Sequence, residues 1–312
     1  MLRSAPATVP RVVTTPRALA KMRARGVYFH GWLYVLPALA AYAAFVLWPI
    51  IQVIRYSFYN WDGVATAQWA GLGNFRTVFD NSQLLSVIGH AFELILFFSG
   101  IPLALGLATA TVLRRFVTGR FGSVARTVLF LPQVIPLVAA GIAWSWMLST
   151  TGAVDEVLND IGLGSLARSW LGDFSTALPS VGVIGAWVLL GLCTVLLLAG
   201  MSKIDLTLYE AAQLDGAGAL REFISITLPA LRQEICVCVT VTVIAALSAF
   251  DIVYISTQGG PGLATMVPGL MVYQLAFYNR QVGLASALAV VLMALVLICI
   301  LPVQWFGRKA DR

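Results

Sequence analysis

Six stretches of the sequence are long and apolar enough to cross a lipid bilayer as helices, and they constrain the fold more than any other feature. A spanning helix needs about 20 predominantly apolar residues. Of the 312 residues, 59% are hydrophobic and only 11% are charged, so a soluble interior could not hide the apolar surface. The sequence predicts an all-α membrane protein with about six transmembrane helices, near residues 31–54, 91–113, 126–149, 177–201, 235–257 and 283–306.

The distribution of basic residues predicts the orientation of the chain. Lys and Arg concentrate in the cytoplasmic segments of membrane proteins. With the N-terminus inside, the inner segments carry 16 of the 20 basic residues, which places both termini in the cytoplasm. The net charge of +6 comes from basic residues in short loops and tails that lie beside the lipid bilayer, so it does not indicate a nucleic-acid partner. The first apolar run is too long for a signal peptide, so it is interpreted as a retained helix.

These spans divide the chain into three parts. A basic cytoplasmic tail is expected at 1–29, a transmembrane domain at 30–307, and a short basic tail at 308–312. Within the transmembrane domain, the segment 202–234 is polar and is predicted to be a cytoplasmic loop. In the third span, the sequence Leu131-Pro132-Gln133-Val134-Ile135-Pro136 predicts a broken helix, because proline removes a helical hydrogen bond.

The polar loop has the pattern of two short helices. Leu206 to Leu214 and Ala219 to Ile226 both read as helical, and Gly216 and Gly218 between them best supply a left-handed turn. Pro229 is expected to end the second helix before the next span. The loop is predicted to be a compact docking element.

The loop also resembles the EAA loop of ABC-importer permease subunits. Glu210-Ala211-Ala212 is followed by Gly216 and then by Ile226 and Leu228-Pro229 at the spacing of that motif. In that family the loop fits a groove on the ATP-hydrolysing subunit and transmits its closure to the membrane helices. The resemblance assigns this coupling role to Glu210, Ala211, Ala212, Asp215, Gly216, Ile226, Leu228 and Pro229.

Two further segments extend the resemblance. Gly71-Leu72-Gly73-Asn74-Phe75 resembles a segment that follows the first span of sugar-type permeases. The stretch from Phe250 and Asp251 to Gly259-Gly260-Pro261 is similar to a signature of carbohydrate-importer permeases. The loop at 150–176 departs from the family, because Gly152-Ala153-Val154-Asp155-Glu156 stands where Gly-x-(Ile/Leu)-Asn is usual.

Two acidic residues lie in or beside the spans. Glu93 and His90 are expected to open the second span, and Asp251 lies near the end of the fifth. A carboxylate in the bilayer is costly and is usually functional or paired. Both acids are expected near outer helix ends, where they could instead reach the interface, so a pathway role and a structural role both stay open. The same two roles are open for Gly259, Gly260 and Pro261.

The resemblance spans roughly residues 30–306 and identifies the chain as a member of the carbohydrate ABC-importer permeases, similar to the maltose and glycerol-3-phosphate permease components. It implies the type I importer permease fold in a bacterial inner (plasma) membrane, and alternating access as the mechanism. The chain is expected not to be an enzyme and to hold no cofactor, because it has no phosphate-binding G-x-x-x-x-G-K-(S/T) sequence. The partners implied are a second, homologous permease subunit forming a heterodimer, two ATP-binding subunits that hold ATP and Mg, an extracytoplasmic solute-binding protein, and a sugar substrate.

Three alternatives are weighed against this hypothesis. A secondary transporter driven by an ion gradient would show several mid-span charges and an inverted repeat, and neither is evident. An ABC importer for a non-sugar solute would share the coupling loop, and the Gly-Gly-Pro signature favours carbohydrate. A membrane-embedded enzyme would need a cluster of His, Asp or Cys. The four cysteines lie in apolar runs and are interpreted as small buried hydrophobes, with no metal site.

Overall fold

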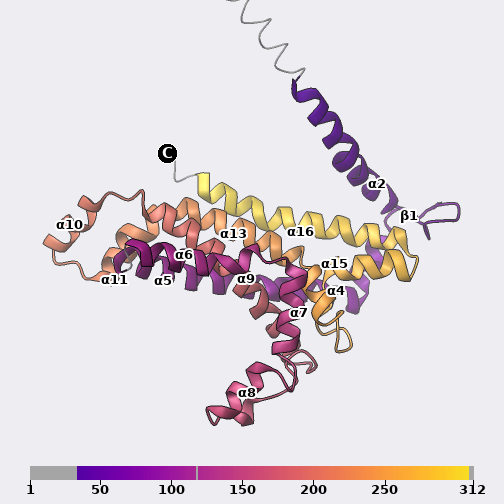
Figure 1. Cartoon of the computed structure of the whole chain (residues 1–312). Coiled ribbons are helices and arrows are strands. Elements are labelled where there is room, and N and C mark those ends of the chain that lie inside the picture. The colour runs from indigo at the N-terminus through magenta and orange to yellow at the C-terminus, as the bar shows by residue number, and fades with distance from the viewer. Residues whose placement is uncertain (1–33, 117–118, 309–312) are drawn as a thin grey trace, which may run out of the picture. The chain divides into compact units, whose positions relative to one another are not determined.

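The computed structural model describes residues 34–116 and 119–308, and it is almost entirely helical (Figure 1). The predicted tail 1–29 and residues 309–312 of the second tail lie outside the described residues. The described residues divide into two units, with the boundary between residues 52 and 53. Among the described residues, four helices are long and apolar enough to cross a membrane, or six if each of two bent helix pairs is one span. The prediction of an all-α membrane protein is confirmed.

The first span runs from Tyr34 to Tyr56 and includes the π-helical η1 (Ala43–Leu47) and the helix α2 (Trp48–Tyr56). The second combines α4 (Ser82–Ile95), η2 (Leu96–Gly100) and α5 (Ile101–Phe116). The remaining two unbroken spans are α9 (Ala177–Met201) and α16 (Val282–Arg308).

The second span begins nine residues earlier than the sequence predicts, so Glu93 lies inside the helix rather than at its start. The side chain of Asn81 caps the helix by accepting hydrogen bonds from the amides of Gln83 (2.9 Å) and Leu84 (3.4 Å). This cap fixes the N-terminus of the helix, because it satisfies amides of the first turn that no helical carbonyl can reach.

The third span is broken as predicted. Helix α6 (Gly119–Val134) meets α7 (Leu137–Met147) at an angle of 97°. Pro136 has an extended backbone (ψ 135°) and stands immediately before α7. It has no amide hydrogen to continue the helical pattern, so the chain turns there.

The prediction of one continuous fifth span at 235–257 is wrong. Helix α13 (Arg232–Leu247) stops, and a separate helix α14 (Asp251–Ser256) begins after three intervening residues. The Ser248 hydroxyl donates to the carbonyl of Ile244 at 2.6 Å, a bond that competes with the helical backbone pattern. No proline or glycine marks this break, so apolar composition alone could not reveal it.

Prolines widen three of the helices. The π-helical segments η1, η2 and η4 (Phe223–Thr227) each end two residues before a proline, namely Pro49, Pro102 and Pro229. Because a proline ring clashes with the preceding turn and donates no hydrogen bond, the turn accommodates it by taking in one more residue. The helices therefore continue past these prolines.

The connections between the spans contain a β-hairpin and several short helices. Strands β1 (Tyr59–Asn60) and β2 (Gln68–Trp69) pair antiparallel, and α3 (Gly73–Asp80) follows them. The Asn74 side chain donates 2.9 Å hydrogen bonds to the carbonyls of Ser57 and Tyr59, so it ties α3 to the hairpin. The other short elements are α8 (Ala153–Asp160), η3 (Gly164–Leu166), α15 (Pro268–Tyr273) and η5 (Gln274–Tyr278).

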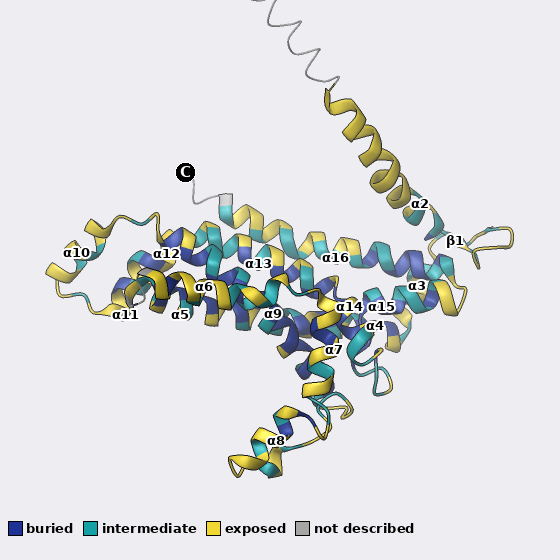
Figure 2. Cartoon of the chain, in the orientation of Figure 1, coloured by how far each residue is buried: buried dark blue, intermediate teal, exposed yellow. Residues whose placement is uncertain are grey.

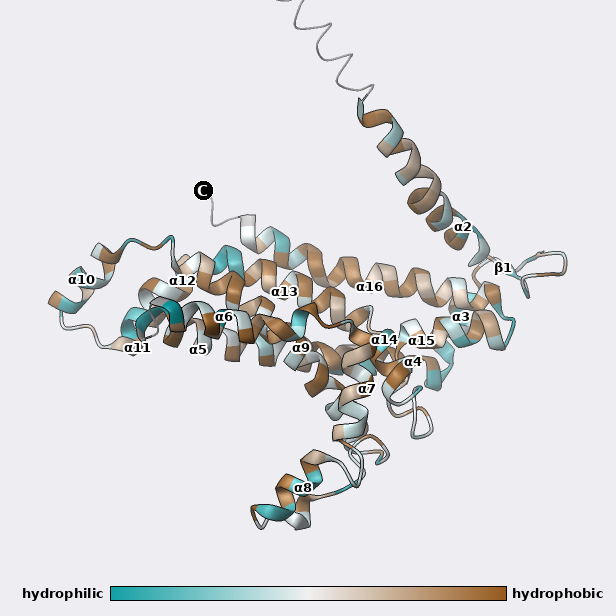
Figure 3. Cartoon of the chain, in the orientation of Figure 1, coloured by the Kyte–Doolittle hydropathy of each residue, from teal (hydrophilic) through white to brown (hydrophobic). Residues whose placement is uncertain are grey.

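Helix α9 forms the centre of the core (Figure 2). A Cβ atom at Gly191 would collide with the backbone carbonyl of Leu129 in α6, and one at Gly185 would collide with the ring of Phe98. These two glycines let α6 and the second span pack close to α9, as small residues do in membrane proteins. Figure 3 shows hydrophobic residues along α9, α13 and α16, and hydrophilic residues concentrated around α11 (Ala219–Glu222).

Candidate coupling loop

The polar loop between α9 and α13, residues 202–231, contains two helical segments at one end of the bundle (Figure 1). The first, α10 (Leu206–Leu214), has the predicted boundaries. Its N-cap is Asp205, whose carboxylate accepts a 3.0 Å hydrogen bond from the amide of Thr207. That bond favours the charged carboxylate and lowers the pKa of Asp205 below its ordinary value.

Helix α10 ends in a glycine turn. Gly216 has φ +76°, a left-handed conformation that L-residues with a side chain adopt at a cost. Its amide donates to the carbonyl of Gln213 at 3.0 Å, and the amide of Ala217 donates to that of Ala212 at 2.9 Å. This pair of bonds is a Schellman motif. The predicted left-handed turn is therefore present at Gly216, whereas Gly218 is extended (φ −78°, ψ 166°).

The second helical segment is longer than predicted. It runs from Ala219 through η4 and α12 (Leu228–Ala230), and it meets α13 at an angle of 70°. The prediction that Pro229 ends this helix is wrong: the helix continues through Pro229, because the wider turn of η4 accommodates the proline. The break occurs at Leu231, which is fully buried.

The side chains assigned to coupling lie mostly on the surface of the loop (Figure 2). Glu210 and Asp215 are exposed, and neither has a side-chain hydrogen bond or ion pair with another described residue. Leu214 is 89% exposed and Leu220 is 72% exposed. Exposed apolar side chains beside unpaired carboxylates are typical of a binding surface. The remaining residues assigned to coupling are Ala211, Leu228 and Pro229, which are exposed, Gly216 in the turn, and Ala212 and Ile226, which are half-buried.

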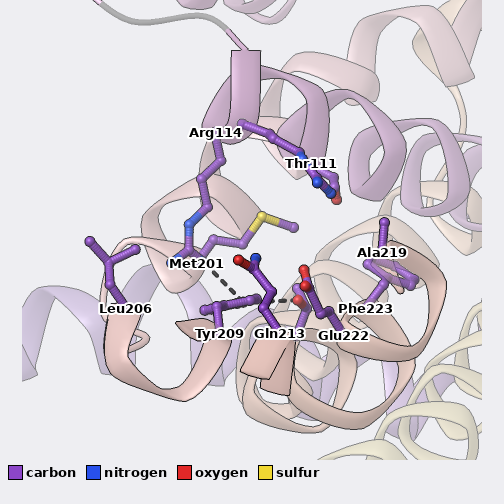
Figure 4. Close-up of a pocket in the computed structure, with 11 residues that line it drawn as sticks. Thr111, Arg114, Met201, Leu206, Tyr209, Gln213, Ala219, Glu222 and Phe223 are labelled. Atoms are coloured by element: carbon purple, nitrogen blue, oxygen red, sulfur yellow. Dashed lines mark hydrogen bonds between the residues drawn. The ribbon is translucent and has the colours of Figure 1, made fainter. Parts of the chain in front are cut away.

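A pocket of about 220 Å³ lies between this loop and the end of α5 (Figure 4). The Tyr209 hydroxyl accepts a 3.1 Å hydrogen bond from the guanidinium of Arg114 and lies 2.9 Å from the Thr227 hydroxyl. Glu222, which is 8% exposed, also lines the pocket. Neither Arg114 nor Thr227 is marked as a functional residue by the sequence. Their only sequence signal was a basic residue in the last turn of a span and a hydroxyl within the loop.

The helices that follow the two breaks, α7 and α14, pack against each other. A Cβ atom at Gly141 of α7 would collide with Ile255 of α14. A cavity of about 380 Å³ beside the breaks is lined by Gln133, Ser248 and Asp251 together with apolar side chains. The Oε1 atom of Gln133 is buried and has no hydrogen-bond partner among the described residues. Asp251 is thus the first residue of α14, at a helix break rather than near the outer end of a continuous span.

Glu93 is exposed on the second span and does not line this cavity. Gly259, Gly260 and Pro261 instead form a turn after α14. Gly259 has φ +89°, and the buried Thr265 hydroxyl donates to the carbonyl of Gly260 at 2.8 Å. The structure therefore gives these three residues a structural role, which is to form this turn.

The described part of the chain offers no candidate metal site. No group of three or more His, Cys, Asp or Glu side chains there could hold a metal ion. His90, which the sequence places beside Glu93, lies with its Nδ1 atom 2.8 Å from the carbonyl of Met266.

Comparison with known proteins identifies the family. The model of the family described as binding-protein-dependent transport system inner membrane component matches residues 100–312. The chain is 32% identical to the probable ABC transporter permease protein YurN of Bacillus subtilis, over 85% of this chain and 91% of the relative. It is 34% identical to the diacetylchitobiose uptake system permease protein NgcF of Streptomyces coelicolor, over 83% of this chain and 77% of the relative.

The fold is also shared with a solved structure. A chain of a bacterial ABC transporter involved in the import of the acidic polysaccharide alginate superposes with a TM-score of 0.76 at 23% identity, covering 95% of this chain and 100% of that chain. The predicted permease fold is thereby confirmed. With several apolar helices and a family match over more than half its length, the chain is a multi-pass membrane protein that belongs to the binding-protein-dependent transport system inner membrane components.

Proposed function

We propose that this chain is one membrane subunit of an ATP-driven importer for a sugar or sugar derivative in a bacterial inner membrane. Both termini are assigned to the cytoplasm. The observation that carries the proposal is the helix–glycine–helix loop at one end of the bundle, with its exposed and unpaired Glu210 and Asp215. In a chain of this family, such a surface fits a separate ATP-hydrolysing subunit.

The docking scheme gives each part of the loop a task. Glu210 and Asp215 make polar contacts with the ATPase, and the small side chains of Ala211 and Ala212 allow close approach. Gly216 holds the turn between the two helices. The two ATPase subunits hold ATP and Mg, and their closure displaces the loop and shifts the spans between inward- and outward-open states.

The cavity at the helix breaks is proposed as part of the translocation pathway. Gln133 offers a buried, unpaired carbonyl oxygen, and Asp251 and Ser248 add polar groups, which a polar solute could satisfy. A single chain supplies one wall of such a pathway, and a second, homologous membrane subunit would supply the other. An extracytoplasmic binding protein would deliver the solute, as the family description indicates.

Carbohydrate is favoured as cargo by the Gly-Gly-Pro signature and by the relatives. The relative NgcF is named for diacetylchitobiose uptake, and the structural match comes from an alginate importer. A non-sugar solute is the alternative cargo, and the binding assay below separates the two.

The decisive experiment is purification of the tagged chain from its native membrane in mild detergent, followed by identification of the bound proteins. An ATPase, a second permease and a solute-binding protein are expected. The recovered binding protein is then titrated with mono- and oligosaccharides and with amino acids by calorimetry. Recovery of the chain without an ATPase under several mild conditions would overturn the proposal.

A further inference from the structure

The hydroxyl of Tyr209 is the point at which three separate helical segments meet. Tyr209 belongs to α10, Arg114 to the last turn of α5, and Thr227 to the end of η4. The hydroxyl lies 3.1 Å from the guanidinium Nη1 atom and 2.9 Å from the Thr227 hydroxyl. Figure 4 shows Tyr209 between Arg114 on one side and the second helical segment on the other, with both hydrogen bonds drawn.

Helix α10 has little else to hold it. None of its residues is buried, and it packs extensively against no other element in the described chain. Its Asp205 cap and its Gly216 turn are bonds within the loop itself. Among the described residues of α10, only Tyr209 makes a side-chain hydrogen bond to another helix.

Arg114 contacts Tyr209 in more than one way. Its Cζ atom lies 4.8 Å from the centre of the Tyr209 ring, and its Nη2 atom donates to the carbonyl of Ile204 at 3.4 Å. The planar guanidinium can therefore contact the ring, the hydroxyl and the loop backbone together, which a lysine ammonium could not. Arg114 also stands at the end of a 34-residue helix, so a force on it acts on the whole second span.

We infer that the Arg114–Tyr209–Thr227 link transmits movement of the loop to the second span, in addition to the covalent path through Leu231 into α13. This inference rests on the proposed docking of the loop to an ATPase. Tyr209 and Thr227 are positioning residues: they touch neither ATP nor solute, and they couple the displacement of α10 to the end of α5. Without the link, α10 tilts on its own and only the fifth span follows.

The test uses the assembled transporter with its ATPase, with Tyr209→Phe and Thr227→Val as separate variants. Both keep the shape of the side chain and remove one hydroxyl. Ser225→Ala is the matched control, because it removes an exposed hydroxyl from the same helical segment, and that hydroxyl has no partner among the described residues. Amide hydrogen exchange is measured at residues 206–214 and 111–116, with and without ATP and magnesium.

In the wild type, ATP is expected to change exchange both in α10 and in the last turn of α5. In Tyr209→Phe the change in α10 persists and the change in α5 is strongly reduced, because the hydrogen bond to Arg114 is gone. In Thr227→Val the change in α5 is reduced less, because the bond between Tyr209 and Arg114 remains and only the hydroxyl that positions Tyr209 is lost. Without ATP, the amides of α10 are expected to exchange about fivefold faster in Thr227→Val than in the wild type, the factor expected for loss of one ordinary hydrogen bond. The increase is larger in Tyr209→Phe, which loses two hydrogen bonds. The double variant behaves like Tyr209→Phe alone, because Thr227 acts through the tyrosine.

Two results would overturn the link. An undiminished response to ATP in α5 of both variants would show that the movement travels by another route. Equal loss of the α5 response in Ser225→Ala would show that any substitution in this helical segment removes the response, so the hydroxyl of Thr227 has no specific role. A wild type that recovers no ATPase fails the proposed function itself, a result separate from either of these.

Discussion

The amide of Ala217 donates a 2.9 Å hydrogen bond to the carbonyl of Ala212, and this bond closes the turn that joins the two helical segments of the loop. The closure requires the residue between them, Gly216, to take φ +76°. The orientation of the exposed residues Glu210 and Asp215 relative to the second segment therefore depends on one glycine.

Substitution of that glycine is expected to distort the loop without affecting the spans. Gly216→Val places a β-branched residue in the left-handed region at a cost of about 1–2 kcal/mol, although no atom lies within 4 Å of the added Cβ. The variant should insert normally and lose most ATP-driven transport. Gly218→Ser is the control, because that position is extended and serine is a good N-cap. Normal transport by Gly216→Val would contradict the assignment of the turn.

The Asp205 cap predicts a contrast between two substitutions. Asp205→Ala leaves the Thr207 amide without its acceptor and should speed exchange in the first turn of α10, whereas Asp205→Asn retains a capping oxygen. Since the cap lowers the pKa of Asp205, its stabilisation is complete above the ordinary pKa and is lost as pH falls through the lowered value. At neutral pH the wild-type cap is therefore fully formed. Equal exchange in both variants would argue against the cap.

Reversal of the charge at Glu210 is expected to affect docking but not folding. Because Glu210 is exposed and unpaired among the described residues, Glu210→Lys should change the stability of the isolated subunit by no more than about 0.5 kcal/mol. Recovery of the ATPase in a mild-detergent purification should fall several-fold. Glu156→Lys, an exposed acid on α8, serves as the control and should recover the ATPase normally. A loss of subunit stability in Glu210→Lys would indicate a structural role instead.

Because α6 packs closely on α9, adding even one methyl group at their contact is expected to destabilise the subunit. Gly191→Ala brings a methyl group onto the Leu129 carbonyl and should destabilise the subunit by about 1–3 kcal/mol, seen as a lower melting temperature in detergent. Gly89→Ala in α4 is the matched control, because nothing lies within 4 Å of its added Cβ. Similar melting temperatures for both variants would show that the α6–α9 contact can relax.

The pathway hypothesis predicts a loss confined to transport. Asp251→Asn and Gln133→Leu change the polar lining of the cavity at the helix breaks, far from the loop in sequence. Both variants should retain the ATPase on purification while uptake of the identified sugar falls. Asp251→Asn is isosteric, so reduced uptake would reflect the charge rather than the size. Unchanged uptake in both variants would remove these residues from the pathway.

Several features of this protein follow from the sequence alone, because they depend on local chemistry. Long apolar runs can be stable only as membrane helices, so the fourth span is found at its predicted boundaries, Ala177–Met201. The helix Leu206–Leu214 and the left-handed Gly216 are likewise set by residues within a few positions of them. Pro136 breaks the third span because it has no backbone donor, which is again a local effect, whereas Pro132 lies within α6.

Other features depend on residues far apart in the sequence and were decided by the tertiary structure. Asp251 begins its own helix after a break that no proline or glycine marks, and Ile255 of that helix packs against Gly141 of α7, 114 positions away in the sequence. The link between Arg114 and Tyr209 joins residues 95 positions apart, and no local pattern could pair them. Sequence period and composition specify which segments become helices, whereas the contacts between helices depend on packing, which only the folded chain defines.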